Sequence, residues 1–253
     1  MKKIAFSLFI MLFAAGAYAQ GDARLDGRGG MIPLTLSDRT KSDAYFVRAE
    51  KQSNKWLFLF HEWWGLNDYI KNEAEKYAAA FPDLNVLALD LYDGKVVFAD
   101  NDSANALKNG IKADRAFKII DAASKHAGAK AQIGTLGWCM GGYWSMQASI
   151  RLGAKSKACV LYYGMPEMDK KKLKTLTAPV LGIFGNQDLS ITPEVVASFI
   201  KVYRPFKRKY EIKKYDATHA FANPSAPGYN ATYAKEAEEQ AMQFIGKYLM
   251  GRK

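Results

Sequence analysis

Short apolar runs alternate with longer amphipathic stretches along most of the chain. Residues 56–60 are apolar at every position, which is typical of a strand buried on both faces of a parallel sheet. Similar runs predict strands at 44–47, 86–89, 133–136, 158–163, 180–184 and 210–215. Helical patterns fill the intervals: 69–81 with Asn67 or Asp68 as its cap, 104–126 as one or two helices, a helix from Gly141-Gly142 to Leu152, a helix from Pro193 to about Tyr203, and 231–249. This alternation predicts one α/β domain with a mostly parallel central sheet and helices on both faces.

The N-terminus has the pattern of a secretory signal peptide. Lys2 and Lys3 precede an apolar run over 4–15, and Ala17-Tyr18-Ala19 gives the small-residue spacing that a signal peptidase needs. The run is shorter than the roughly 20 residues that span a bilayer. We therefore expect a signal peptide at 1–19 with cleavage after Ala19, export to the periplasm or the medium, and no membrane association of the mature chain. An uncleaved N-terminal anchor is the alternative.

The rest of the chain is expected to form a flexible lead-in over 20–30, which is rich in glycine, and one domain over 31–250. Its composition excludes several classes of protein. Two cysteines are too few for a disulfide scaffold or a four-thiolate zinc site, and three histidines make a multi-histidine metal site hard to build. We therefore expect no metal and no cofactor.

The formal net charge of the chain is +11, and the lysines are spread along it. Because no nucleic-acid-binding motif contains them, we expect a solvated basic surface and no nucleic-acid partner. The pattern specifies no oligomeric state.

The segment Gly137-Trp138-Cys139-Met140-Gly141 has the pattern of a nucleophile elbow, with cysteine where serine is commoner. It follows a predicted strand and opens a predicted helix. Glycines at the flanking positions leave room for the strained turn. The turn would lift Cys139 above the sheet edge and aim the backbone N–H of Met140 at the same place, which favours a thiolate and an oxyanion.

A cysteine nucleophile needs a base, and His219 follows the last predicted strand. Asp188 follows the strand before it, so the chain order is nucleophile, acid, histidine. Since the carboxyl ends of parallel strands meet at one edge of a sheet, we expect Cys139, Asp188 and His219 to form a catalytic triad. Asp216 is the competing acid, but it lies too close to the strand end to face the histidine easily. For His219 alone, the alternative is a hydrogen-bonded loop histidine.

A fourth feature, His61-Glu62-Trp63-Trp64-Gly65, directly follows the strand at 56–60. It begins like the zinc motif H-E-x-x-H, but Gly65 replaces the second histidine. We interpret it as the loop whose backbone N–H, on Trp63, supplies the second donor of an oxyanion hole. Glu62 would then point into the site beside Cys139, and His61 is expected to be structural.

These residues together resemble the dienelactone hydrolase (carboxymethylenebutenolidase) family of the α/β-hydrolase fold. The resemblance covers about 31–250 and rests on residues 61–67, 90–92, 137–142, 162–164, 188 and 219–221. It implies hydrolysis of a small-molecule ester or lactone through an acyl-thioester, with Cys139 as nucleophile, His219 as base and Asp188 as the orienting acid. It also implies that Glu62 bonds the resting cysteine and helps to shift its proton, and that the N–H groups of Trp63 and Met140 form the oxyanion hole.

The sequence departs from this family in the residues that bind the substrate carboxylate. Known members use arginines, one of them four residues after the catalytic histidine, where this chain has Asn223. The second arginine has no clear equivalent after Asp90-Leu91-Tyr92. We expect Trp64, Phe221 and Asn223 to contact the substrate, and the aromatic loop favours an apolar or ring-containing one.

The second cysteine, Cys159, is expected to be a buried structural residue. It lies about four residues short of the end of its strand, so at ~3.3 Å per residue it would be more than ~10 Å from Cys139. That exceeds the roughly 7 Å that a disulfide can bridge. Two other functions stay open: a non-catalytic binding module on the same fold, which would need a broken triad, and a redox protein using Cys139, although no C-x-x-C motif is present.

Overall fold

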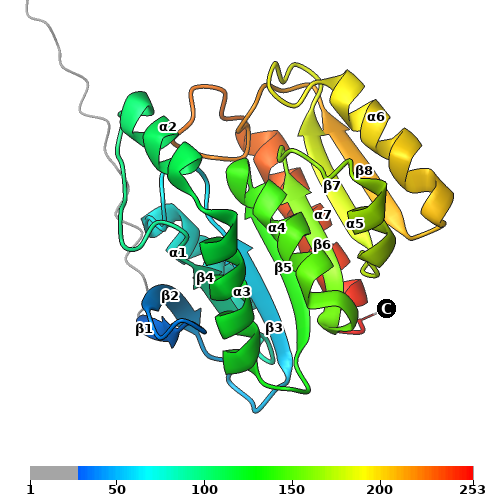
Figure 1. Ribbon diagram of the computed structural model, residues 1–253. Coiled ribbons are helices and arrows are strands. Elements are labelled where there is room, and N and C mark those ends of the chain that lie inside the picture. Colours follow the sequence, from blue (N-terminus) through cyan, green and yellow to red (C-terminus); the bar gives the residue numbers. More distant parts are fainter. Residues whose placement is uncertain (1–27, 253) are drawn as a thin grey trace, which may run out of the picture.

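The apolar runs form one sheet of eight strands, shown with its helices in Figure 1. The computed structural model describes residues 28–252, so the expected signal peptide and residues 20–27 of the expected lead-in lie outside the described residues. The strands are β1 (Gly29–Thr35), β2 (Lys41–Val47), β3 (Lys55–Phe60), β4 (Asn85–Leu89), β5 (Gln132–Trp138), β6 (Ser156–Tyr162), β7 (Val180–Gly185) and β8 (Tyr210–Tyr215). Their order across the sheet is β1-β2-β4-β3-β5-β6-β7-β8.

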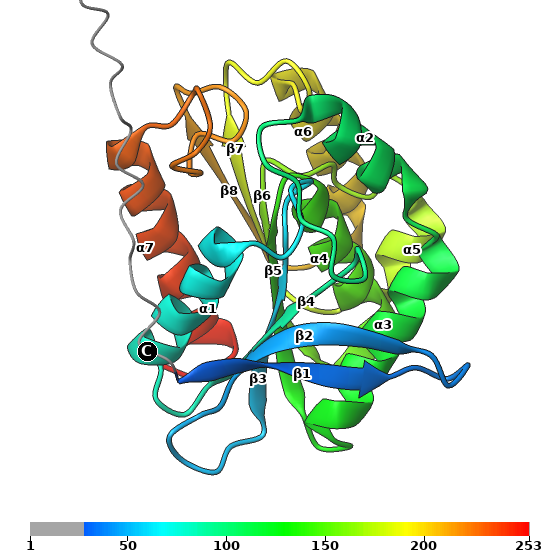
Figure 2. The same cartoon turned by 90° about the vertical axis from the view of Figure 1, so that its left-hand side faces the viewer.

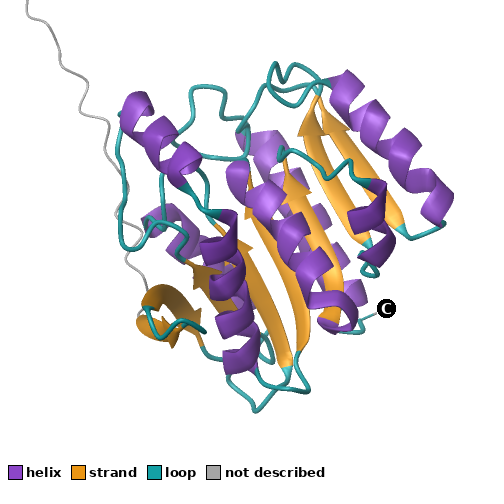
Figure 3. Cartoon of the chain, viewed as in Figure 1, coloured by secondary structure: helices purple, strands orange, loops and turns teal. Residues whose placement is uncertain are grey.

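Most of the sheet is parallel. The strands β4, β3, β5, β6, β7 and β8 pair with their neighbours in parallel, and only the β1–β2 and β2–β4 pairs are antiparallel. All parallel strands therefore end at the same edge, and the loops that follow them gather at the top of the molecule in Figure 3. This edge is where a parallel α/β sheet builds its site.

Helices cover both faces of the sheet, as Figures 1 and 2 show. One face packs against α1 and α7, through residues such as Tyr77 and Phe244. The other face packs against α3, α4 and α6, through residues such as Ile119, Trp144 and Phe199. The helices are α1 (Asp68–Ala80), α2 (Asn101–Gly110), α3 (Ala113–Ala127), α4 (Met140–Leu152), α5 (Lys170–Thr175), α6 (Pro193–Tyr203) and α7 (Ala231–Tyr248), with short 3₁₀ turns at Gly153–Lys155 and Arg204–Phe206.

The α/β architecture predicted from the sequence is confirmed, and the strong patterns are found close to their expected positions. Asn67 caps α1 by accepting a hydrogen bond from the backbone of Ile70, and the stretch 104–126 is two helices. Two elements were not predicted. The edge strand β1 has a single buried residue, Leu34, and β1 begins at Gly29, two residues before the expected start of the domain. The short helix α5 likewise buries only Leu173.

Both cysteines are free, as expected from their positions along the sheet. Cys159 lies opposite Thr135 in the β5–β6 ladder and is fully buried. Within residues 28–252, no helix is both long and apolar enough to cross a membrane.

Candidate active site

The site is built around the sharp turn between β5 and α4. Cys139 lies between these elements with φ 53° and ψ −120°, and its backbone N–H donates to the carbonyl of Tyr162 at 2.9 Å. A positive φ is strained for a residue with a side chain, so the surrounding structure must hold it. A Cβ atom on Gly137 would collide with the backbone of Gly141, and one on Gly141 would collide with the backbone of Phe60. The turn therefore has the geometry of a nucleophile elbow.

The three predicted triad residues are in direct contact. His219 lies with Nε2 at 3.1 Å from Cys139 Sγ and with Nδ1 at 2.7 Å from Asp188 Oδ2. The other carboxylate oxygen, Asp188 Oδ1, accepts from the backbone N–H groups of Ser190 at 2.7 Å and Ile191 at 2.9 Å. The loops after β5, β7 and β8 thus bring a thiol, a carboxylate and an imidazole, in that order, into hydrogen-bonded contact.

The competing acid, Asp216, does not reach the histidine. It directly follows β8, and its carboxylate accepts a hydrogen bond from the amide of Gln187 at 2.8 Å. The carboxylate that bonds His219 in this structure is that of Asp188.

The electrostatics of these contacts favour a charged pair on His219 and Asp188. Burial lowers the pKa of His219, but its hydrogen bonds to Asp188 and Cys139 outweigh burial and raise the pKa to about 10. Burial raises the pKa of Asp188, but the bonds from His219 and two backbone N–H groups outweigh it and hold the pKa below its usual value. Near neutral pH the imidazole carries a proton on Nδ1 toward Asp188 and can present a second on Nε2 toward the sulfur.

Glu62 is buried next to these residues, at 3% exposure. Its carboxylate accepts from the hydroxyl of Tyr163 at 3.2 Å and from the side-chain amide of Asn223. Burial raises the pKa of Glu62 to about 7, against the opposing effect of these two hydrogen bonds. The expected bond from Cys139 to Glu62 is absent among the hydrogen bonds of the described residues, where the two carboxylate oxygens accept from Tyr163 and Asn223.

Two backbone N–H groups that the sequence assigns to an oxyanion hole are unpaired in the described part of the chain. Those of Trp63 and Met140 have no hydrogen-bond partner among residues 28–252. Met140 is the first residue of α4, so its N–H also lies at the positive end of the helix dipole. These are the two donors that the sequence predicted for an oxyanion hole.

Comparison with known proteins identifies the family of this chain. The model of the dienelactone hydrolase family matches residues 42–249. This chain belongs to the dienelactone hydrolase family. It is therefore a hydrolase of the ester or lactone type.

Individual relatives agree with this family. The chain is 25% identical over 216 residues to a putative carboxymethylenebutenolidase of Aquifex aeolicus, covering 81% of this chain and 93% of the relative. It is 29% identical over 210 residues to a probable 2-oxo-3-(5-oxofuran-2-ylidene)propanoate lactonase of a Bradyrhizobium species, covering 75% and 82%. A solved dienelactone hydrolase-like promiscuous phosphotriesterase from metagenomic libraries has the same fold, with a TM-score of 0.75, 21% identity, and coverage of 88% of this chain and 99% of that one.

The expected substrate-binding residues divide into two groups. Trp64 is partly exposed and lies beside Trp63, with their ring centroids 4.7 Å apart. Phe221 and Asn223 are buried, at 0% and 2% exposure. The ring of Phe221 packs against Tyr163, and Asn223 bonds Glu62, so contact of these two residues with a substrate stays a prediction.

Tyr163 is a site residue that the sequence analysis quoted but gave no role. Its backbone has φ 36°, its hydroxyl donates to Glu62, and its ring lies 5.2 Å from the ring of His219. The signal available in the sequence was its place at the end of the strand predicted at 158–163. Within residues 28–252, no group of three or more His, Cys, Asp and Glu side chains could hold a metal ion.

The raised pKa of Glu62 predicts how stability changes with pH. Between its ordinary value of 4.5 and its folded value of about 7, the folded protein binds the Glu62 proton more strongly than the unfolded chain does. The free energy of unfolding should therefore fall as the pH rises through this range, by up to about 3 kcal/mol from this group. Glu62→Gln cannot ionise, so its Tm relative to that of the wild type should rise from pH 4.5 to pH 7 in thermal melts. A Tm difference that stays constant over this range would contradict the buried, uncharged state.

Proposed function

We propose that this chain hydrolyses an ester or lactone by covalent catalysis, with Cys139 as the nucleophile and an acyl-thioester intermediate. The observation that carries the proposal is the continuous line from Asp188 through His219 to the sulfur, with hydrogen-bonded distances of 2.7 and 3.1 Å. Nucleophile, base and orienting acid within such reach define a triad by role and geometry.

In the acylation step, the proton of Cys139 Sγ passes to His219 Nε2, and the sulfur attacks the carbonyl carbon. The carbonyl electrons move onto oxygen, which accepts hydrogen bonds from the N–H groups of Trp63 and Met140. The tetrahedral intermediate then collapses, the bond from carbon to the leaving oxygen breaks, and His219 gives its Nε2 proton to that oxygen. The products are an alcohol, or the ring-opened hydroxyl of a lactone, and a thioester on Cys139.

In the deacylation step, His219 is neutral at Nε2 and accepts a proton from a water molecule. The resulting hydroxide attacks the thioester carbon, and the same two N–H groups bind the oxygen of the second tetrahedral intermediate. Expulsion of the thiolate releases the acid and restores the starting pair. Asp188 stays ionised throughout and fixes the tautomer of the ring.

The surroundings of the site favour a substrate recognised by its apolar surface. Trp63 and Trp64 are partly exposed on the loop after β3. The buried Asn223 stands where known members of the family have an arginine. We infer that an uncharged ester or lactone with an apolar or ring-containing group suits this site.

Trapping the intermediate tests the proposed mechanism. The protein, mixed with p-nitrophenyl acetate and quenched in acid within a turnover, should carry one acetyl group on the peptide that contains Cys139, as read by mass spectrometry. An ester that turns over while no acyl group is found on that peptide, even at short quench times, would count against the thioester.

We also propose that the chain is exported and that its leader is removed after Ala19. The positive start, the short apolar run and the Ala-x-Ala spacing support this proposal. N-terminal sequencing of the protein from a bacterial periplasmic fraction should begin at Gln20. A cytoplasmic protein that retains Met1 and Lys2 in the same host would refute it.

A further inference from the structure

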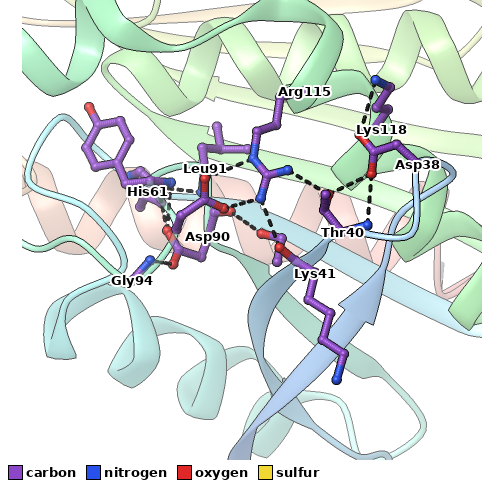
Figure 4. A network of polar contacts seen from close by, with 12 residues as sticks. Asp38, Thr40, Lys41, His61, Asp90, Leu91, Gly94, Arg115 and Lys118 are labelled. Atoms are coloured by element: carbon purple, nitrogen blue, oxygen red, sulfur yellow. Dashed lines mark hydrogen bonds and ion pairs between the residues drawn. The ribbon is translucent and has the colours of Figure 1, made fainter.

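A buried histidine without a catalytic role lies at the end of β3, beside the loop that carries Trp63. His61 is 0% exposed and packs its ring against that of Tyr92, with centroids 4.7 Å apart. Its Nδ1 lies 2.6 Å from the carbonyl oxygen of Glu62, and the backbone N–H of Leu91 points at its Nε2 from 3.1 Å. Figure 4 shows this histidine between β3 and the turn after β4.

The contacts settle which nitrogen of His61 carries the proton. A backbone N–H can only donate, so Nε2, facing Leu91, is the acceptor and Nδ1 is the donor to Glu62. Burial lowers the pKa of His61, which keeps this neutral form. Asp90 Oδ1 lies 3.9 Å from Nε2, but no ion pair forms with a nitrogen that carries no proton.

The turn after β4, which carries the N–H of Leu91, is itself held by hydrogen bonds. Asp90 accepts from the backbone N–H of Tyr92 at 2.8 Å and from that of Gly94, which closes the turn after β4. The N–H of Leu91 lies within this turn, so His61 joins a fixed point after β4 to the first peptide group after Glu62.

That peptide group is the one that carries the proposed oxyanion donor. The carbonyl of Glu62 and the N–H of Trp63 belong to one planar trans peptide and point in opposite directions. Two donors hold the carbonyl, Nδ1 of His61 at 2.6 Å and the backbone N–H of Gly65 at 3.2 Å. Fixing the carbonyl on one side therefore fixes the direction of the N–H on the other.

We propose that His61 is a positioning residue, which aims the Trp63 N–H into the oxyanion hole. Its Nδ1 donates to the Glu62 carbonyl, and its Nε2 accepts from the N–H of Leu91. This inference rests on the proposed function, in which the Trp63 N–H binds the oxyanion. An oxyanion exists only in the transition state and the tetrahedral intermediates, so the effect of His61 should appear in kcat and not in KM.

Two substitutions separate the two hydrogen bonds. The side chain of His61→Gln can accept from Leu91 at the place of Nε2 but no longer donates from the place of Nδ1. That of His61→Asn keeps a donor near Nδ1 and loses the acceptor for Leu91. Removing an oxyanion donor outright costs about 10²- to 10³-fold in kcat, and Gly65 still holds the carbonyl, so we expect roughly tenfold for His61→Gln. We expect His61→Asn to recover most of that loss, although the unpaired buried N–H of Leu91 should lower its Tm by several degrees.

The experiment measures kcat and KM with p-nitrophenyl acetate, the Tm, and the rate of Cys139 alkylation by iodoacetamide. Alkylation forms no oxyanion, so its rate should equal that of the wild type in both variants, whereas general damage to the site would slow it. The matched control is His126→Gln, a histidine that contacts Phe46 and Trp56 at the far end of the sheet and should not change kcat.

The proposal is overturned if His61→Gln keeps the wild-type kcat, or if His61→Asn loses turnover by tenfold or more. The second outcome decides the matter even if His61→Gln does not fold. Failure of the proposed function has a different signature, since ester turnover would then persist in Cys139→Ala whatever residue stands at position 61.

Discussion

Cys139→Ala is expected to lose ester turnover by roughly 10⁴-fold or more, down to the small rate that binding and the oxyanion donors alone can supply. The reason is chemical: without the sulfur no thioester forms, and His219, whose Nε2 lies 3.1 Å from that atom, loses its side-chain nucleophile. Initial rates with p-nitrophenyl acetate at several enzyme concentrations measure the loss. Acid-quenched samples of the variant should also carry no acetyl group.

Cys159→Ala is the matched control, because it removes the other thiol of the chain. Burial raises the pKa of Cys159 to about 11, so this thiol stays protonated and unreactive at neutral pH. Its sulfur lies 3.9 Å from the hydroxyl of Ser145, within the β6 and α4 packing. We expect unchanged kcat and a modest loss of Tm. Full turnover in Cys139→Ala, or loss of turnover in Cys159→Ala alone, would refute the assignment of the nucleophile.

The sequence was most informative where local pattern and topology decide the outcome. The buried strands were predicted because residues such as those at 56–60 are apolar at every position, and the triad was predicted because parallel strands end at one edge. Both arguments need only the order of elements along the chain. They place Asp188 and His219 at the same edge as Cys139 without any knowledge of side-chain packing.

The partners of Glu62 were beyond that kind of reasoning. Asn223 is 161 positions away in sequence, and its contact with Glu62 depends on the path of the loop between β8 and α7. This residue, expected to contact the substrate, bonds the carboxylate of Glu62 in the structure. The edge strand β1 and the helix α5 were missed for a related reason, since each buries one side chain and so leaves almost no hydrophobic pattern.

Replacing Asp188, the partner of His219, is expected to cause the second large loss of kcat. In Asp188→Asn, the amide oxygen should take the place of Oδ1, because the N–H groups of Ser190 and Ile191 require an acceptor there. The amide nitrogen would then face His219 Nδ1 and donate to it, which forces the ring proton onto Nε2 and removes the charge that raises the pKa of His219. The same exchange in a serine triad costs about 10⁴-fold in kcat, and we expect a loss of roughly 10³-fold here.

Asp216→Asn is the control that separates the effect of the His219 tautomer from the effect of losing one negative charge nearby. Asp216 is the neighbouring carboxylate, bonded to Gln187 and not to the histidine, so its removal changes the local charge by the same amount. We expect kcat within about twofold of the wild type for this variant. The Asp188→Asn protein should also show a slower alkylation of Cys139, because a neutral His219 places no positive charge beside the sulfur. If both aspartate variants lose turnover equally, the loss comes from the removed negative charge and not from the orientation of His219. Asp188 is then not the triad acid.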